Sequence, residues 1–167
     1  RFEYVSIFFV SISAIKSKAD FKFIYLFLLI SLVGVAICGY GQRYYNFPII
    51  TTMNEEFSKG QLLRMDVWTR VSSTFAGHYD LAAYLSLILI VLISIFTIVK
   101  NKLLKMLSII LFLVGFNLLT QTASRVSIFA FWGGSLVSLF LIKKYFWIIP
   151  LSLLVIYSMF TSADLNQ

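Results

Sequence analysis

The sequence predicts an all-α fold, a polytopic integral membrane bundle of helices. Three observations predict this fold. Hydrophobic residues make up 60% of the chain and charged residues only 13%, with a mean hydropathy of +0.91, whereas about a quarter of the residues in a soluble domain are charged. Apolar runs of about 20 residues, the length that crosses a bilayer, recur along the chain. Short breaks that carry lysine separate these runs.

The lysines set the expected orientation of the helices. Except for Lys59, all of them lie in three breaks between apolar runs: Lys16, Lys18 and Lys22; Lys100, Lys102 and Lys105; Lys143 and Lys144. Positive residues concentrate in the cytoplasmic loops of membrane proteins, so we place all three clusters on the cytoplasmic side. Membrane topology thereby accounts for the net charge of +7, and we expect no nucleic-acid partner. The single cysteine, Cys38, allows no internal disulfide and suggests no thiolate metal site.

Six helices follow in order from this placement. A clipped first helix descends to the first lysine cluster, a second crosses outward, and a long external loop precedes the third. The expected helices are about 2–15, 23–41, 80–99, 105–121, 126–142 and 146–160, with the external loop at 42–79. We expect residues 161–167 to begin a second, truncated external loop. The chain as a whole is expected to be a fragment of a larger membrane protein.

Local signals support the third helix and the loop before it. The external loop has balanced charges and interleaved aromatic residues such as Tyr44 and Trp68, which favours a position along the outer headgroups. Asp80 directly precedes the apolar segment LAAYLSL. We therefore expect Asp80 to cap the N-terminus of that helix.

The last two helices carry signals of their own. Ala130, Gly134 and Ser138 fall four residues apart, a stripe of small side chains that lets a neighbouring helix approach closely. Plain helix packing is the simplest role for this stripe. Pro150 falls within the last apolar run, where we expect it to kink the helix.

Ionisable residues are essentially missing from the helix interiors and gather at the outer rim. A pump or ion-coupled carrier usually needs such residues at mid-depth. The helices that start near Asp80 and Ser127 point their N-termini outward, and a helix N-terminus favours an anion. Each follows an arginine among hydroxyls: Arg70 with Ser72, Ser73 and Thr74, and Arg125 with Thr120, Thr122 and Ser124. Because the guanidinium fork fits phosphate oxygens, this pattern predicts a phosphate-bearing lipid at the outer interface.

Simpler roles are also compatible with these residues. Arg125 could snorkel to the outer headgroups, and Arg70 could pair with Asp66 at helical spacing. His78, the single histidine, is more typical of a structural or surface residue than of a catalytic base. Alone it cannot form a metal site. The sequence therefore predicts neither a metal nor a cofactor.

Two segments resemble a known family. RVSSTFAGHYDLAAYL and LLTQTASRVSIFAFWGG resemble the O-antigen ligase and O-antigen polymerase family of bacterial membrane glycosyltransferases. In that family an arginine precedes a Ser/Thr-Gly-Phe-type turn and a helix of the LAAYL kind. A second arginine follows a T-x-S-R turn, with a glycine-bearing helix behind it. Here these positions are Arg70 and Arg125, and the resemblance covers about residues 64–160.

The resemblance implies a GT-C-like, metal-independent glycosyltransferase in the bacterial cytoplasmic (inner) membrane. Such an enzyme transfers or polymerises a glycan carried on undecaprenyl diphosphate, at the outer face, to an acceptor glycan, lipid or protein. The implied partners are this lipid-linked glycan, the acceptor and the membrane lipids. The implied diphosphate-binding residues are Arg70, Arg125, Ser72, Ser73, Thr74 and Ser124.

The catalytic base stays unassigned. In the family, the proposed catalytic histidine comes from a large external loop, and we expect TSADLNQ to be only the start of that loop. The fragment itself is therefore expected to be inactive. His78 lies in the earlier AGHYD turn and is a fallback candidate only. Two other classes remain as alternatives: a flippase or other multi-pass transporter for lipid-linked sugars, and a non-catalytic assembly or sensor subunit.

Overall fold

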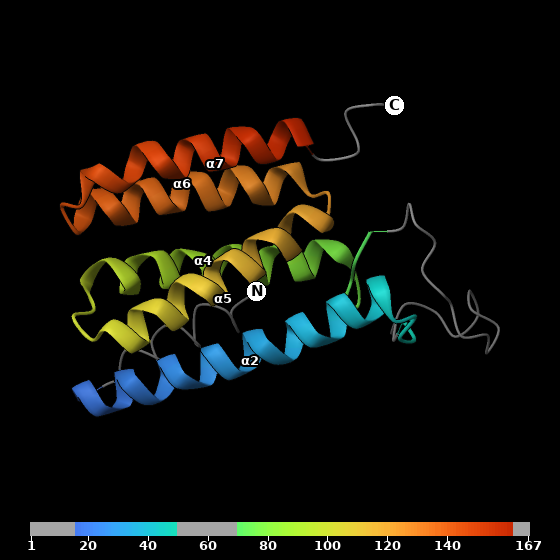
Figure 1. Ribbon diagram of the computed structural model, residues 1–167, viewed down its shortest axis with the longest axis horizontal. Helices are drawn as coiled ribbons and strands as arrows, with labels where there is room; N and C mark the ends of the chain where they lie inside the picture. The colour runs from blue at the N-terminus through green and yellow to red at the C-terminus, as the bar shows by residue number, and fades with distance from the viewer. Residues whose placement is uncertain (1–15, 50–69, 162–167) are drawn as a thin grey trace, which may run out of the picture. The chain divides into compact units, whose positions relative to one another are not determined.

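The computed structural model describes residues 16–49 and 70–161, and all regular structure in these residues is helical. The helices are α2 (Lys18–Tyr44), α4 (His78–Ile98), α5 (Lys102–Gln121), α6 (Arg125–Leu141), the short 3-10 helix η1 (Tyr145–Trp147) and α7 (Ile148–Thr161) (Figure 1). The all-α part of the predicted fold class is confirmed for the described residues.

Three of these helices are long and apolar enough to cross a membrane: the part of α2 from Ala19 to Tyr44, α4 and α5. The apolar helices that follow them are shorter. Where the structure describes an expected helix, its ends lie within a few residues of the expected ones. The expected helix at about 2–15, residues 50–69 of the external loop and residues 162–167 lie outside the described residues.

One local expectation was wrong, and a second stays untested. Asp80 does not cap α4, because Gly77 is the N-cap residue and no side chain bonds there. Asp80 lies instead in the first turn, where a carboxylate interacts favourably with the helix dipole. Pro150 is the third residue of α7 rather than an interior residue. In the first turn of a helix the missing N–H of proline costs no hydrogen bond within α7, and the expected kink stays a prediction.

The chain divides into two compact units, residues 1–31 and 32–167, and α2 begins in the first. Reciprocal hydrogen bonds start this helix. The Ser17 N–H donates to Asp20 Oδ2 at 2.8 Å, and the Asp20 N–H donates to Ser17 Oγ at 3.2 Å. This capping box satisfies backbone donors that have no partner inside the helix.

In the second unit α4 packs against both α5 and α6, and α7 packs against α6 (Figure 1). The buried residues of α4 recur every three or four positions, as on one face of an amphipathic helix. They include Leu81, Leu85, Leu89 and Leu92, each at most 1% exposed. Phe131 of α6 and Leu118 of α5 are fully buried as well. Leucine and phenylalanine packing along α4 therefore forms the core of this unit.

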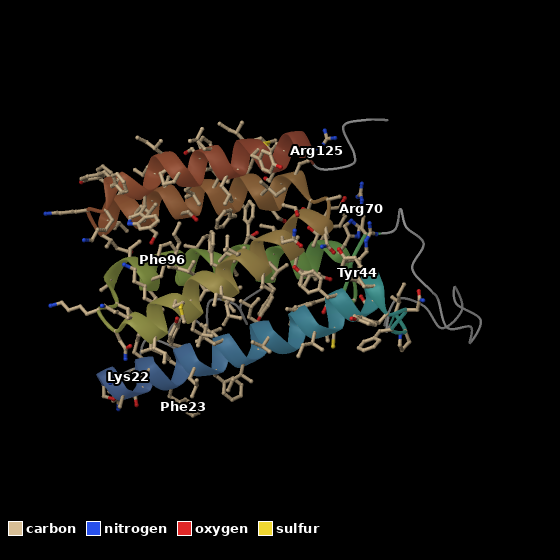
Figure 2. The ribbon with its side chains drawn as sticks, viewed as in Figure 1. Lys22, Phe23, Tyr44, Arg70, Phe96 and Arg125 are labelled. Carbon is tan, nitrogen blue, oxygen red and sulfur yellow. The ribbon has the colours of Figure 1, made fainter. Side chains whose placement is uncertain are left out.

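The two ends of the second unit differ in charge. The α4–α5 connection carries Lys100, and the α6–α7 connection carries Lys144, at one end of these helices. Arg70 and Arg125 lie at the other end (Figure 2). The antiparallel order of α4 to α7 thus separates lysine from arginine, as the positive-inside interpretation requires.

Small side chains bring α6 close to α4. The hydroxyls of Ser94 and Ser138 lie 2.6 Å apart. A Cβ atom added at Gly134 would come within 2.5 Å of Ile90 Cδ1. Two members of the predicted small-residue stripe therefore face α4, whereas the third, Ala130, is exposed.

Replacing Gly134 with valine should lower the thermal stability of the protein in detergent. A Cβ here meets the flexible end of Ile90, and the two further methyl groups of valine add to the overlap, so we expect a cost of about 1 kcal/mol, at the low end for overpacking. Gly133→Val is the matched control, because a Cβ at Gly133 meets nothing within 4 Å and the change in helix propensity is the same. Thermal melts followed by circular dichroism should give the lower Tm for Gly134→Val. Equal Tm values would contradict the close α4–α6 contact.

Candidate functional site

A cavity with a charged lining lies at the arginine-bearing end of the second unit. It has a volume of about 270 Å³ and is lined by Arg70, Tyr79, Ala123, Ser124, Arg125 and Val126. The lining residues come from the segment before α4, the first turn of α4 and the α5–α6 turn. Figure 2 shows both labelled arginines at this end of the helices. The two arginines singled out in the sequence therefore meet in one cavity.

The α5–α6 turn presents Ser124 and Arg125 to the cavity. Thr122, fully buried, anchors the turn by donating its hydroxyl hydrogen to the Leu119 carbonyl at 2.7 Å. Ala123 has a φ of 53°, a left-handed conformation that few non-glycine residues adopt. This conformation reverses the chain within a few residues, so α6 starts directly beside the end of α5.

A backbone hydrogen bond joins the two arginine-bearing segments. The Val71 N–H donates to the Gln121 carbonyl at 3.4 Å, and Val71 is fully buried. Arg70 precedes this bond by one residue, and Arg125 follows Gln121 by one turn. The fold thus brings together two arginines that are far apart in the sequence.

The N-terminus of α6 adds positive potential to the cavity. Ser124 is the N-cap residue, but its side chain accepts no hydrogen bond from the backbone of α6. Its hydroxyl donates instead to Ser127 Oγ at 2.9 Å. The positive end of the α6 dipole therefore adjoins the cavity with no capping oxygen from Ser124. Together with the guanidinium groups of Arg70 and Arg125, this helix end suits an anion.

His78 contacts the same site through Arg70. The distance from Arg70 Nη1 to His78 Nε2 is 3.3 Å. A guanidinium can only donate, so Nε2 accepts, and the imidazole is neutral with its proton on Nδ1. The His78 ring also lies against Tyr79, with ring centroids 4.1 Å apart. In this arrangement the Nε2 lone pair faces Arg70, and the His78 ring contacts Tyr79.

The hydroxyl residues after Arg70 do not line the cavity, in contrast to the expectation from the sequence. Ser73 is 1% exposed and has a φ of 53°. Its hydroxyl donates to the Val35 carbonyl of α2 at 2.7 Å. Ser72 is also buried, and Thr74 is exposed. The predicted residues that do share the cavity are Arg70, Ser124 and Arg125.

Reasoning from the sequence missed Gln42, which anchors this segment to α2. Its Oε1 accepts from the Ser73 N–H at 2.8 Å, and its Nε2 donates to the Ser73 carbonyl at 2.9 Å. Gln42 is only 2% exposed. A polar residue near the end of an apolar helix is the sole signal in the sequence for this role. Tyr79 was missed as well, because an aromatic residue at a helix start is commonplace at a membrane interface.

Within residues 16–49 and 70–161, no three His, Cys, Asp or Glu side chains gather in an arrangement suited to a metal ion. Comparison of the chain with protein-family models, with curated proteins and with solved structures finds no match. Function is therefore inferred from the chemistry of the cavity and from the two segments of the sequence that form it.

Replacing Gln42 with methionine should loosen the segment that carries Arg70. Without the amide, the Ser73 N–H and carbonyl lose their partners, at a cost of about 1–3 kcal/mol. Hydrogen exchange of the Ser73 amide should then be roughly ten to a hundred times faster than in the wild type. Tyr44→Leu, an exposed change in the same helix end, is the control and should leave this rate unchanged. An unaltered rate in Gln42→Met would show that the amide does not hold the segment.

Proposed function

We propose that this protein is a membrane glycosyltransferase of the O-antigen ligase or O-antigen polymerase type. It crosses the bacterial cytoplasmic membrane several times and acts at the outer face. It transfers or polymerises a glycan from undecaprenyl diphosphate onto a hydroxyl of an acceptor glycan or lipid. The cavity that Arg70 and Arg125 line is the proposed binding site for the diphosphate.

The convergence of Arg70 and Arg125 on one cavity carries this proposal. Both line the volume of about 270 Å³, together with the start of α6. Guanidinium groups bind phosphate oxygens through short, charge-assisted hydrogen bonds. The volume lies just below the roughly 300–1,000 Å³ of typical small-molecule pockets. A volume of this size accommodates a diphosphate headgroup.

The proposed reaction places growing negative charge where these groups lie. The acceptor hydroxyl oxygen bonds to the anomeric carbon, and the bond from that carbon to the diphosphate oxygen breaks. The electron pair leaves with the diphosphate. The hydroxyl proton passes to a general base, for which no residue is assigned. Arg70, Arg125 and the positive end of α6 are in place beforehand, so they stabilise the leaving diphosphate with little reorganisation. This stabilisation needs no metal ion.

The proposed membrane topology draws support from the distribution of charge. α2, α4 and α5 have the length and apolarity of membrane spans. In the second unit, lysines lie at one end of the helices and Arg70 and Arg125 at the other. With the lysines in the cytoplasm, the cavity opens at the outer face. The O-antigen ligase and polymerase family, which the chain resembles, uses undecaprenyl-diphosphate-linked glycans at that face.

A flippase or other multi-pass transporter for the same lipid-linked sugars is the alternative function. Transport pathways usually have ionisable residues at mid-depth. In the helices that the structure describes, charged residues lie close to the helix ends, as Lys22, Arg43 and Lys105 do. This distribution favours a site at the membrane surface over a path through the membrane.

Arg70→Lys and Arg125→Lys should each lower glycan transfer roughly ten- to a hundredfold. Lysine keeps the charge but loses the bidentate hydrogen bonds, which contribute about 1.5–3 kcal/mol. The measurement is consumption of an undecaprenyl-diphosphate-linked glycan by membranes from cells that express the protein, at matched protein levels. Arg43→Lys is the control, because Arg43 lies in the last turn of α2 and does not line the cavity.

Full activity in both lysine variants would overturn the diphosphate site. It would leave the two arginines as membrane anchors, as in a non-catalytic subunit. Equal losses in all three variants, Arg43→Lys included, would point to a general effect of rim arginines on insertion instead.

The proposed topology is tested by labelling single cysteines in intact cells. In a Cys38→Ser background, Thr74→Cys should react with a membrane-impermeant maleimide from outside, whereas Lys144→Cys should react only after the cells are permeabilised. Both positions are exposed in the structure, so burial does not explain a failure to react. Labelling of Lys144→Cys in intact cells would show that the orientation is the reverse of the proposed one and that the cavity does not open at the outer face.

A further inference from the structure

We infer that Tyr79 is a stacking platform for the first sugar of the lipid-linked glycan, an inference that rests on the proposed function. Tyr79 belongs to the first turn of α4 and lines the cavity of the two arginines. Its side chain is 60% exposed. A large open ring therefore lies beside the groups that would bind the diphosphate.

Neighbouring side chains hold the Tyr79 ring relative to the arginines. The His78 ring lies against it, with centroids 4.1 Å apart and planes inclined by 39°. Arg70 in turn donates to His78 Nε2 at 3.3 Å. The contacts form a chain from Arg70 through His78 to Tyr79. A ligand that binds Arg70 therefore lies close to the Tyr79 ring.

The chemistry of the substrate fits this order of groups. In a glycan linked through diphosphate, the first sugar is bonded directly to the phosphate that leaves. A pyranose ring carries a face of C–H bonds with partial positive charge, and the face of an aromatic ring carries partial negative charge. An aromatic ring that lines the diphosphate cavity is thus within reach of the first sugar. The ligand class is a pyranose with one apolar face.

The competing role for Tyr79 is that of a plain interface anchor. Ala83 and Leu87 are exposed below it on α4, spaced so that all three share one face of the helix. Aromatic residues at the end of such a face often lie among lipid headgroups. An anchor, however, would not distinguish a lipid diphosphate that carries a sugar from one that does not.

Binding of two probes to the protein in lipid nanodiscs separates these roles. The probes are undecaprenyl diphosphate and undecaprenyl-diphosphate-linked N-acetylglucosamine. The wild type should bind the sugar-bearing probe roughly three- to tenfold more tightly than the bare one, as expected for one aromatic contact. Tyr79→Leu should abolish this preference, so that the two probes bind with equal affinity. Tyr79→Phe, which keeps the ring, should retain the preference.

The outcomes distinguish this inference from the proposed function. Thermal melting in detergent, which should match the wild type because the Tyr79 side chain is 60% exposed, serves as the folding control in each Tyr79 variant. An unchanged preference in Tyr79→Leu, or no preference in the wild type, would overturn the platform role and leave the diphosphate site intact. Arg125→Lys should weaken the binding of both probes by the same factor. If it weakens neither, the diphosphate site and the proposed function fail together.

Discussion

The pairing of the Gln42 amide with the Ser73 backbone is the contact on which the arginine-bearing end of the second unit depends. The segment before α4 is irregular, so its backbone N–H and carbonyl groups need partners from outside a helix. Gln42 supplies both partners for Ser73, and the Gln121 carbonyl accepts from the Val71 N–H. Fixed at these two points, the segment holds Arg70 beside the α5–α6 turn. The cavity thus depends on hydrogen bonds to these backbone groups as much as on its charged side chains.

Inside the helices, hydroxyl groups are accommodated without disturbing the apolar packing. Ser86 and Ser108 donate to carbonyls one turn earlier in their own helices, at 2.7 and 2.6 Å. Interhelical contacts such as Ser94–Ser138 contribute only about 0.6–2 kcal/mol each. Ser135 is fully buried, and its hydroxyl has no hydrogen-bond partner among the described residues. Polar contacts between the helices therefore supplement the packing of leucine and phenylalanine side chains along α4.

Much of this arrangement could be predicted from the sequence, because hydrophobic run length and charge are local properties. Those properties located α2, α4, α5 and α6 to within a few residues, and they singled out Arg70 and Arg125. The cap of α4 could not be predicted, since Gly77 and Asp80 both precede an apolar run and only the backbone path selects between them. The role of Ser73 was equally hidden. A hydroxyl beside an arginine suggests an anion site, but the position of α2 decides which way the Ser73 hydroxyl points.

The division of lysine and arginine between opposite helix ends has a consequence for how the chain enters the membrane. On the proposed topology, the α5–α6 turn has to be carried across the bilayer with Arg125 in it. Moving one positive charge outward against the membrane potential costs roughly 2.3 kcal/mol per 100 mV. Inserted together, α5 and α6 bring two apolar segments into the bilayer, which offsets this cost more fully than α5 by itself. Because the turn between them is so tight, α5 and α6 are suited to insert as one hairpin during synthesis. The lysines at both ends of the hairpin would then stay behind in the cytoplasm and fix its direction.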